Sequence, residues 1–252
     1  MATSSSVFRE YSSFNPIVLE KKGRLKIARQ IWGVLRRELS DRKLTSLALL
    51  DIGCSSGIIT NYLSEYFGQV YGLDNDENSI TIAKKNFRRR NLHFSVGDAI
   101  RTGLPDESFD VVVANQVYYC FEYPGDFIKE VFRVVKNGGL VFFGARNKYT
   151  LWDAQYHLPL LAFLPKFLAD FVVRIFGRSD GFSAKYMDYW QLAKLTRNFE
   201  VKKITPDIIK NPNYYGFRDI AKIGWLTRIF PANFWRLVEP VFPNFIWILR
   251  KK

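Results

Sequence analysis

LLDIGCSSG, residues 49–57, is the stretch of this 252-residue chain that decides its fold. The apolar run 47–52 predicts a buried strand, Gly53 and Gly57 predict a tight turn, and residues 58–67 predict a helix. Glycines in such a turn let the backbone approach a ligand, and the amides that open the helix favour a carboxylate or phosphate. The spacing fits the dinucleotide pattern G-x-G-x-x-G badly, and the Gly-Lys-Ser/Thr of a P-loop is absent.

Strands and helices alternate along the rest of the chain. Such alternation predicts an α/β domain with a seven-stranded, mostly parallel sheet and helices on both faces. We expect Asn137-Gly138-Gly139 to cap the helix that precedes it. The expected helices are 21–39, 58–67, 79–90, 126–135 and 189–199, and the expected strands are 47–52, 69–73, 92–96, 109–114, 140–144, 200–204 and 245–249.

Two acidic residues follow predicted strands and narrow the choice of ligand. Asp74 ends the second strand, 23 positions after Asp51, where a carboxylate can hold both hydroxyls of an adenosine ribose. Asp98 follows the third strand, where a carboxylate can accept a hydrogen bond from an adenine amino group.

With these residues the chain resembles the class I S-adenosyl-L-methionine (SAM)-dependent methyltransferases over roughly residues 45–147. The Phe-Asp strand and the Lys-Asn-Gly-Gly-Leu turn look most like the small-molecule type 11 group, which includes quinone-biosynthesis methyltransferases. The resemblance implies a Rossmann-like fold and SAM as the cofactor. The matching segments are 51–57, 72–74, 96–99, 109–115 and 134–140.

The resemblance implies roles for the residues of the first turn. Asp51 would orient the methionine amino group, directly or through water. The methionine and ribose would be lined by Gly53, Cys54, Ser55 and Gly57. Many members have glycine where this chain has Ser55, and a small residue there is a mild departure.

The resemblance also implies roles for the residues that follow the second and third strands. Asp74 would bind the ribose hydroxyls, with Asn75 beside the adenine. Asp98 and the amide of Ala99 would read the adenine.

The reacting end of the cofactor would lie near Asn115 and Gln116, by the same resemblance. Methyl transfer from a sulfonium is an in-line displacement that requires alignment and exclusion of water, and a base helps when the acceptor is a hydroxyl. The sequence after Asn115 is not Pro-Pro-Tyr, which argues against methylases of adenine or glutamine amino groups. The candidate catalytic residues are His157, Tyr118 and Tyr119.

The chain has two cysteines, Cys54 and Cys120, which make no metal-ligand spacing, so we expect no metal. Cys120 lacks the Pro-Cys context of cytosine C5 chemistry, and we expect it to be packed. The polar N-terminus does not read as a signal peptide, and no stretch reaches the roughly 20 apolar residues that span a bilayer. These features predict a cytoplasmic protein that can be peripheral to a membrane.

The basic charge is concentrated in the second part of the chain. The formal net charge is +13, of which residues 146–252, with 18 Lys/Arg and 8 Asp/Glu, contribute +10. The same part holds 22 of the 41 aromatic residues. This combination favours an anionic partner, either nucleic acid or a membrane surface, but a solvated basic face over an aromatic core explains it equally well.

We expect a single methyltransferase domain over 1–252, with an N-terminal arm and helix at 1–44 and a SAM-binding core at 45–147. Helical insertions at 148–185 and 211–243 follow the fifth strand and precede the seventh. Within residues 158–177 a polar stripe, Lys166, Asp170 and Arg174, recurs every four positions on an otherwise apolar helix. Such a segment forms either a lid over an acceptor or a helix laid in a membrane interface.

Both insertions are expected at the edge of the sheet where ligands bind, so they predict a hydrophobic acceptor such as a prenylated ring, a lipid or a lipid-linked sugar. The leading hypothesis is a methyltransferase for a small hydrophobic or lipid-linked acceptor, working at an anionic membrane surface. The alternative is an RNA methyltransferase that uses the basic half, although no appended RNA-binding motif is visible. A third reading is a scaffold that binds SAM and a partner without catalysis.

Overall fold

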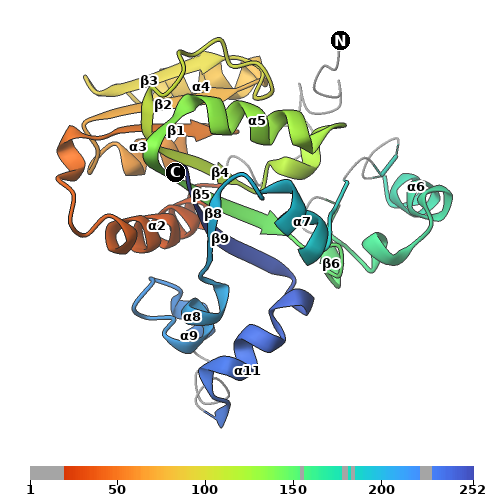
Figure 1. Cartoon of the computed structure of the whole chain (residues 1–252). Coiled ribbons are helices and arrows are strands. Elements are labelled where there is room, and N and C mark those ends of the chain that lie inside the picture. Colours follow the sequence, from red (N-terminus) through yellow and green to blue (C-terminus); the bar gives the residue numbers. More distant parts are fainter. Residues whose placement is uncertain (1–19, 154–155, 178–180, 183–184, 222–228) are drawn as a thin grey trace.

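The computed structural model describes residues 20–153, 156–177, 181–182, 185–221 and 229–252. They form a seven-stranded sheet flanked by helices, and a separate two-stranded sheet (Figure 1). Residues 1–19 of the expected N-terminal arm lie outside the described residues, as do 154–155, 178–180 and 183–184 of the first expected insertion and 222–228 of the second.

The large sheet has the strand order β3-β2-β1-β4-β5-β9-β8. Its first five strands in the chain are parallel, whereas β9 pairs antiparallel with both β5 and β8. The seven-stranded, mostly parallel sheet predicted from the sequence is therefore confirmed. The strands are β1 (Ala48–Ile52), β2 (Gln69–Asp74), β3 (Leu92–Val96), β4 (Phe109–Asn115), β5 (Val135–Arg146), β8 (Glu200–Lys203) and β9 (Asn244–Arg250).

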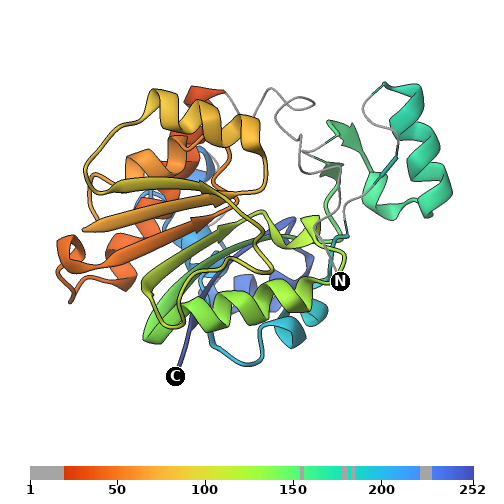
Figure 2. The same cartoon turned by 90° about the horizontal axis from the view of Figure 1, so that it is seen from above.

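Helices cover both faces of the sheet (Figures 1 and 2). One face carries α2 (Lys21–Glu38), α3 (Ile58–Leu63) and α8 (Thr205–Lys210), and the other carries α5 (Pro124–Val134) and α7 (Tyr189–Leu195). The remaining α-helices are α4 (Glu77–Asn86), α6 (Lys166–Ile175), α9 (Arg218–Ala221) and α11 (Ala232–Leu237), and single 3₁₀ turns lie at Leu44–Ser46, Tyr118–Cys120, Leu161–Phe163 and Glu239–Val241.

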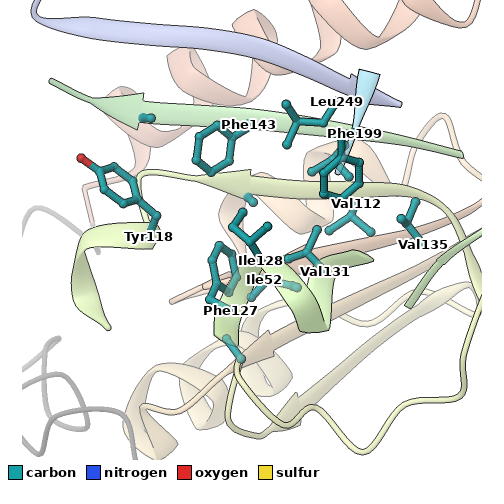
Figure 3. Packing of buried hydrophobic residues seen from close by; sticks show 14 of the residues in the cluster. Ile52, Val112, Tyr118, Phe127, Ile128, Val131, Val135, Phe143, Phe199 and Leu249 are labelled. Atoms are coloured by element: carbon teal, nitrogen blue, oxygen red, sulfur yellow. The ribbon is translucent and has the colours of Figure 1, made fainter. Parts of the chain in front are cut away.

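The centre of the sheet is buried on both faces. The apolar run of β4 is buried from Phe109 to Ala114, as a central parallel strand between two helical layers requires. Residues of α5 at helical spacing, Phe127 and Val131 among them, pack on the β1, β4 and β5 side chains (Figure 3). This packing fixes the ends of β1 and β4, where the candidate site lies.

The expected glycine cap after α5 is wrong. The helix ends at Val134, and Val135 is already extended and paired with Phe109 of β4. The pairing then jumps to Val111 with Leu140, so residues 136–139 form a bulge in β5. Gly138, with φ +70°, serves this bulge by turning its amide to the carbonyl of Lys251 at 2.8 Å.

The first insertion is not one continuous helix over 158–177. Its start is a hairpin of β6 (Trp152–Asp153) with β7 (Leu158–Pro159), the 3₁₀ turn at Leu161–Phe163 follows, and α6 begins only after its N-cap residue, Pro165. Within α6 the expected polar stripe is present, with Lys166 Nζ 2.8 Å from Asp170 Oδ2. In both views α6 stands apart from the large sheet (Figures 1 and 2).

The second insertion consists of short helices in its described part. Pro231 caps α11 at its start, in line with the expectation that prolines divide this segment. None of the helices in the described part of the chain combines the length and apolar content needed to cross a bilayer.

We predict that Gly33→Ala destabilises the fold. A β-carbon at Gly33 in α2 would overlap the carbonyl oxygen of Tyr215 and lie 2.8 Å from the carbonyl carbon, and backbone cannot swing away as a side chain can. We expect a loss of about 1–3 kcal/mol in the free energy of unfolding, measured by urea denaturation. Gly125→Ala in α5 is the matched control, since nothing lies within 4 Å of its added carbon. It should be neutral or gain up to about 1 kcal/mol, and equal effects of the two variants would contradict this account.

Candidate cofactor and acceptor site

The turn that follows β1 is held against the end of β2 by backbone hydrogen bonds. The amides of Gly53 and Cys54 both donate to the carbonyl of Leu73, at 2.8 and 3.2 Å. Gly53 and Gly57 have φ of +77° and +74°, a region that side chains disfavour, and Gly57 immediately precedes α3. The turn therefore adopts the conformation for which the sequence needs its glycines.

Side chains from other strands press on these glycines. A β-carbon at Gly57 would lie 2.6 Å from the ring of Phe94 on β3, and one at Gly53 would lie 2.7 Å from Val117 Cγ2. The ring of Phe94 would also lie 2.7 Å from a β-carbon at Gly72. Phe94 and Val117 therefore lie so close to these glycines that a side chain at any of the three positions would not fit.

Asp74 joins the turn to the end of β2. Its Oδ2 accepts from the amide of Ser55 at 2.8 Å, and its Oδ1 accepts from the amide of Asp76 at 3.0 Å. Burial raises the pKa of the Asp74 carboxyl, and these amides oppose that shift. Asn75 follows directly, so both predicted ribose and adenine residues lie beside the first turn.

Asp51 lies beneath the turn and is buried. Its Oδ2 accepts a 2.6 Å hydrogen bond from Thr60 Oγ1 on α3. Burial raises the pKa of Asp51 to about 7, while the Thr60 hydrogen bond and the charge of Arg24 on α2 act to lower it. A carboxyl of this kind gains stability as an anion when a cation is placed beside it.

The end of β4 contributes an unusual backbone. Gln116 has φ +61°, rare for a residue with a side chain, and its amide donates to the carbonyl of Gly144 on β5 at 2.7 Å. Asn115 lies against Gly144, whose added β-carbon would overlap Asn115 Oδ1. Of the described side chains, Ser55 and Gln116 each have a buried oxygen, Oγ and Oε1, without a hydrogen-bond partner. Buried acceptors without partners are costly in a folded protein, and they mark this edge as one built to meet donors.

Asp98 and Ala99 form the loop after β3. Asp98 Oδ1 accepts from the amide of Ile100 at 3.1 Å, and Ala99 is buried against the core. Burial raises the pKa of the thiols of both Cys54 and Cys120, which disfavours the thiolate that nucleophilic chemistry requires.

The three candidate catalytic residues do not form one cluster: Tyr118 and Tyr119 follow β4, whereas His157 lies in the first insertion. The Tyr118 hydroxyl donates to the carbonyl of Arg146 at 2.6 Å and accepts from the amide of Met187 at 3.0 Å. Tyr119 follows at the surface of the same site and packs edge-on against Tyr186, with ring centroids 4.9 Å apart. His157 lies in the β6–β7 turn with φ +55°, and no hydrogen bond within the described part of the chain joins it to the other two.

Sequence reasoning missed three residues of this site. Thr60 carries a weak signal, since it lies in the first turn of a helix whose preceding loop is the glycine turn. Tyr186 donates to Asp153 Oδ2 at 2.8 Å, and Arg146 ends β5; neither carries a local sequence signal. Their partners are far along the chain, so only the fold brings them together.

The comparisons with known proteins agree with the fold and with the position of the first turn. Residues 50–143 match the family model described as "Methyltransferase domain". A solved structure titled as an S-adenosylmethionine dependent methyltransferase from Mesorhizobium loti superposes with a TM-score of 0.56 at 17% identity, covering 88% of this chain and 98% of that chain. The fold is thus the class I methyltransferase fold, as the sequence predicts.

Two curated relatives are similar over part of their lengths. The demethylmenaquinone methyltransferase of Lactococcus lactis is 34% identical over 146 residues, 54% of each chain. The ubiquinone biosynthesis O-methyltransferase of Pelagibacter ubique is 27% identical over 161 residues, 61% of this chain and 65% of that protein. The matches therefore span between about half and two thirds of these relatives.

We predict that Asp51 makes stability depend on pH. Its pKa in the folded state, about 7, lies above the ordinary value of 3.8 for an aspartate. Between these values the folded state binds more protons than the unfolded state, so stability falls as pH rises from 4 to 7. In urea denaturation over this range, the wild type should lose up to about 4 kcal/mol relative to Asp51→Asn, which cannot ionise. Parallel stability curves for the two proteins would contradict the burial of an ionisable Asp51.

Proposed function

We propose, from the premise that residues 50–143 form a methyltransferase domain, that this chain transfers a methyl group from SAM to a small hydrophobic acceptor. When bound, SAM would supply an electrophilic methyl on a sulfonium, with S-adenosylhomocysteine as the leaving group. The observation that carries the proposal is the joining of Asp51, Asp74 and the glycine turn at the carboxyl edge of the sheet.

The residues of this edge fit SAM. Its α-amino cation suits Asp51, a buried carboxyl beside the turn, and its ribose hydroxyls suit Asp74, whose carboxylate has lone pairs beyond the two that the amides of Ser55 and Asp76 use. The unsatisfied oxygens of Ser55 and Gln116 are acceptors for further donors of a ligand. We assign lining of the methionine and ribose to Gly53, Cys54, Ser55 and Gly57, and the adenine end to Asn75, Asp98 and Ala99.

The Tyr118 hydroxyl is an anchor in this proposal, since two backbone groups occupy it and burial raises its pKa. Tyr119 lines the acceptor path from the end of β4. The chain's contribution to the reaction is alignment and exclusion of water, which in-line displacement chiefly requires.

A hydrophobic acceptor fits the exposed aromatic face of the first insertion. On α6, Phe167 is 70% exposed and Phe171 is 60% exposed, far more than a lid packed on its own domain would leave uncovered. Lys166 and Arg174 flank these rings on the same helix. Apolar rings flanked by cations suit an anionic membrane surface, from which a quinone-like or lipid-linked acceptor is drawn. Of the two relatives, one is named a demethylmenaquinone methyltransferase and the other a ubiquinone biosynthesis O-methyltransferase.

RNA as the acceptor has less support. Most of the exposed side chains of α6 are apolar, with Lys166 and Arg174 among them, whereas a surface that tracks phosphates presents mainly Lys and Arg.

Isothermal titration with SAM tests the cofactor. The wild type should bind with one site, and Asp74→Asn should weaken the affinity by about ten- to a hundredfold, because hydrogen bonds from the ribose to a charged carboxylate are lost. Asp41→Asn, a change of the same kind at an exposed loop position, should leave binding unchanged. Absence of wild-type binding, or wild-type affinity in Asp74→Asn, refutes the proposal.

Co-sedimentation with vesicles tests the membrane contact. The wild type should sediment with vesicles containing phosphatidylglycerol, less with neutral phosphatidylcholine, and less at high salt. Phe167→Ser with Phe171→Ser should abolish sedimentation, because the inserted rings are lost. Trp190→Ser on α7, which removes another ring that is 62% exposed, is the control and should sediment like the wild type. Equal sedimentation with both kinds of vesicle rules out an anionic surface as the partner.

A further inference from the structure

Arg146 is the last residue of β5 and lies at the carboxyl edge of the sheet. Two positions earlier, Gly144 pairs with Asn115 of β4, and side chains two apart on a strand share one face of the sheet. The carbonyl of Arg146 receives the Tyr118 hydroxyl bond, which fixes the backbone at this point. Arg146 therefore stands beside the end of β4, where we place the reacting end of the cofactor.

The guanidinium of Arg146 is poorly satisfied. The side chain is half-buried, its Nε is fully buried, and no described residue accepts from that Nε. Its hydrogen bond from Nη1 to the carbonyl of Trp152 is long, at 3.4 Å, and no carboxylate in the described ranges forms an ion pair with it. A guanidinium has five N–H donors, and the buried Nε–H of Arg146 has lost water without gaining an acceptor, which is unfavourable.

The neighbouring acid is engaged elsewhere. Asp153 is buried, with Oδ2 accepting from the Tyr186 hydroxyl at 2.8 Å and Oδ1 accepting from the amide of Tyr156 at 2.9 Å. The charge of Arg146 acts to lower the pKa of both Tyr118 and Tyr186, against the larger effect of their burial, so the cation is close enough to act on both hydroxyls. Tyr119 and Tyr186 add an edge-on aromatic pair. A cation whose Nε–H donor is unpaired thus lies near a group of tyrosines.

We propose that Arg146 binds an oxyanion group, a carboxylate or a phosphate, on the methyl acceptor. The planar guanidinium matches either group through paired N–H···O bonds, and the tyrosine rings accept the apolar body next to it. The inference rests on the proposed function and deepens it: the acceptor is an amphiphile with an anionic oxygen group. Arg146 is thus a binding residue: it sets specificity and takes no part in the bond changes.

Nuclear magnetic resonance of the arginine side chains tests the binding site directly. The protein is labelled with ¹⁵N-arginine, saturated with S-adenosylhomocysteine, and the Arg146 Nε–H signal is assigned by its loss in Arg146→Lys. Titration with benzoate and, separately, inorganic phosphate should shift this signal saturably in the millimolar range, and the stronger of the two identifies the oxyanion. Arg90→Gln, which removes an exposed cation from the opposite edge of the sheet, should leave the shift intact. An Arg146 signal unmoved by both anions overturns the proposal.

Methyl labelling tests the acceptor. The protein is incubated with methyl-labelled SAM and a cell extract, and the products are separated by anion exchange. Label should enter retained, anionic products, and Arg146→Gln should raise KM for that fraction about ten- to a hundredfold while the SAM affinity stays unchanged. Label found only in neutral products overturns the role of Arg146 but leaves the methyltransferase proposal standing. If no product is labelled and SAM does not bind, the proposed function fails, and the anion titration of the cofactor-free protein decides the case of Arg146.

Discussion

The carbonyl of Leu73 accepts hydrogen bonds from Gly53 and Cys54, and the carboxylate of Asp74 accepts one from Ser55. These three bonds tie the turn after β1 to the end of β2, so the geometry of one cannot change without the other. Phe94 of β3 closes the same corner against Gly57 and Gly72. The polar groups at the carboxyl edge keep their positions because three neighbouring strands meet at this corner. These groups therefore need little rearrangement when a ligand binds.

Apolar side chains are buried in the core of the sheet but exposed on α6. The parallel strands and their helices bury theirs almost completely, whereas α6 turns Phe167, Phe171 and Ile175 outward. This helix packs through Ala169, Val172 and Val173 on its own small cluster, which is separate from the two clusters that cover the sheet. The candidate cofactor site and α6 are supported by separate hydrophobic clusters. The exposure of apolar side chains on α6 therefore does not disturb the geometry of the site.

The sequence predicts the sheet well because its strands are local features. The three valines at 111–113 clearly indicate a buried strand, and Asp74 and Asp98 lie on the same side of the sheet because parallel strands end at one edge. The bulge at 136–139 is less predictable, since Asn-Gly-Gly reads equally as a helix cap until the carbonyl of Lys251 arrives from the far end of the chain. The contacts of Arg146 and of the Tyr186–Asp153 pair are equally hard to predict. Tertiary structure sets their partners, and no sequence spacing indicates them.

The position of β9 has a consequence for biosynthesis. This strand is the last in the chain order, yet it lies between β5 and β8 in the sheet. While the ribosome is still making residues before 244, β5 is an open edge and β8 has no strand to pair with, although β1 to β4 already contain the complete first turn. A nascent chain at this stage exposes the backbone of a long apolar strand, the kind of edge on which chains aggregate. Pairing of β9 with β5 and β8 removes that open edge and completes the sheet.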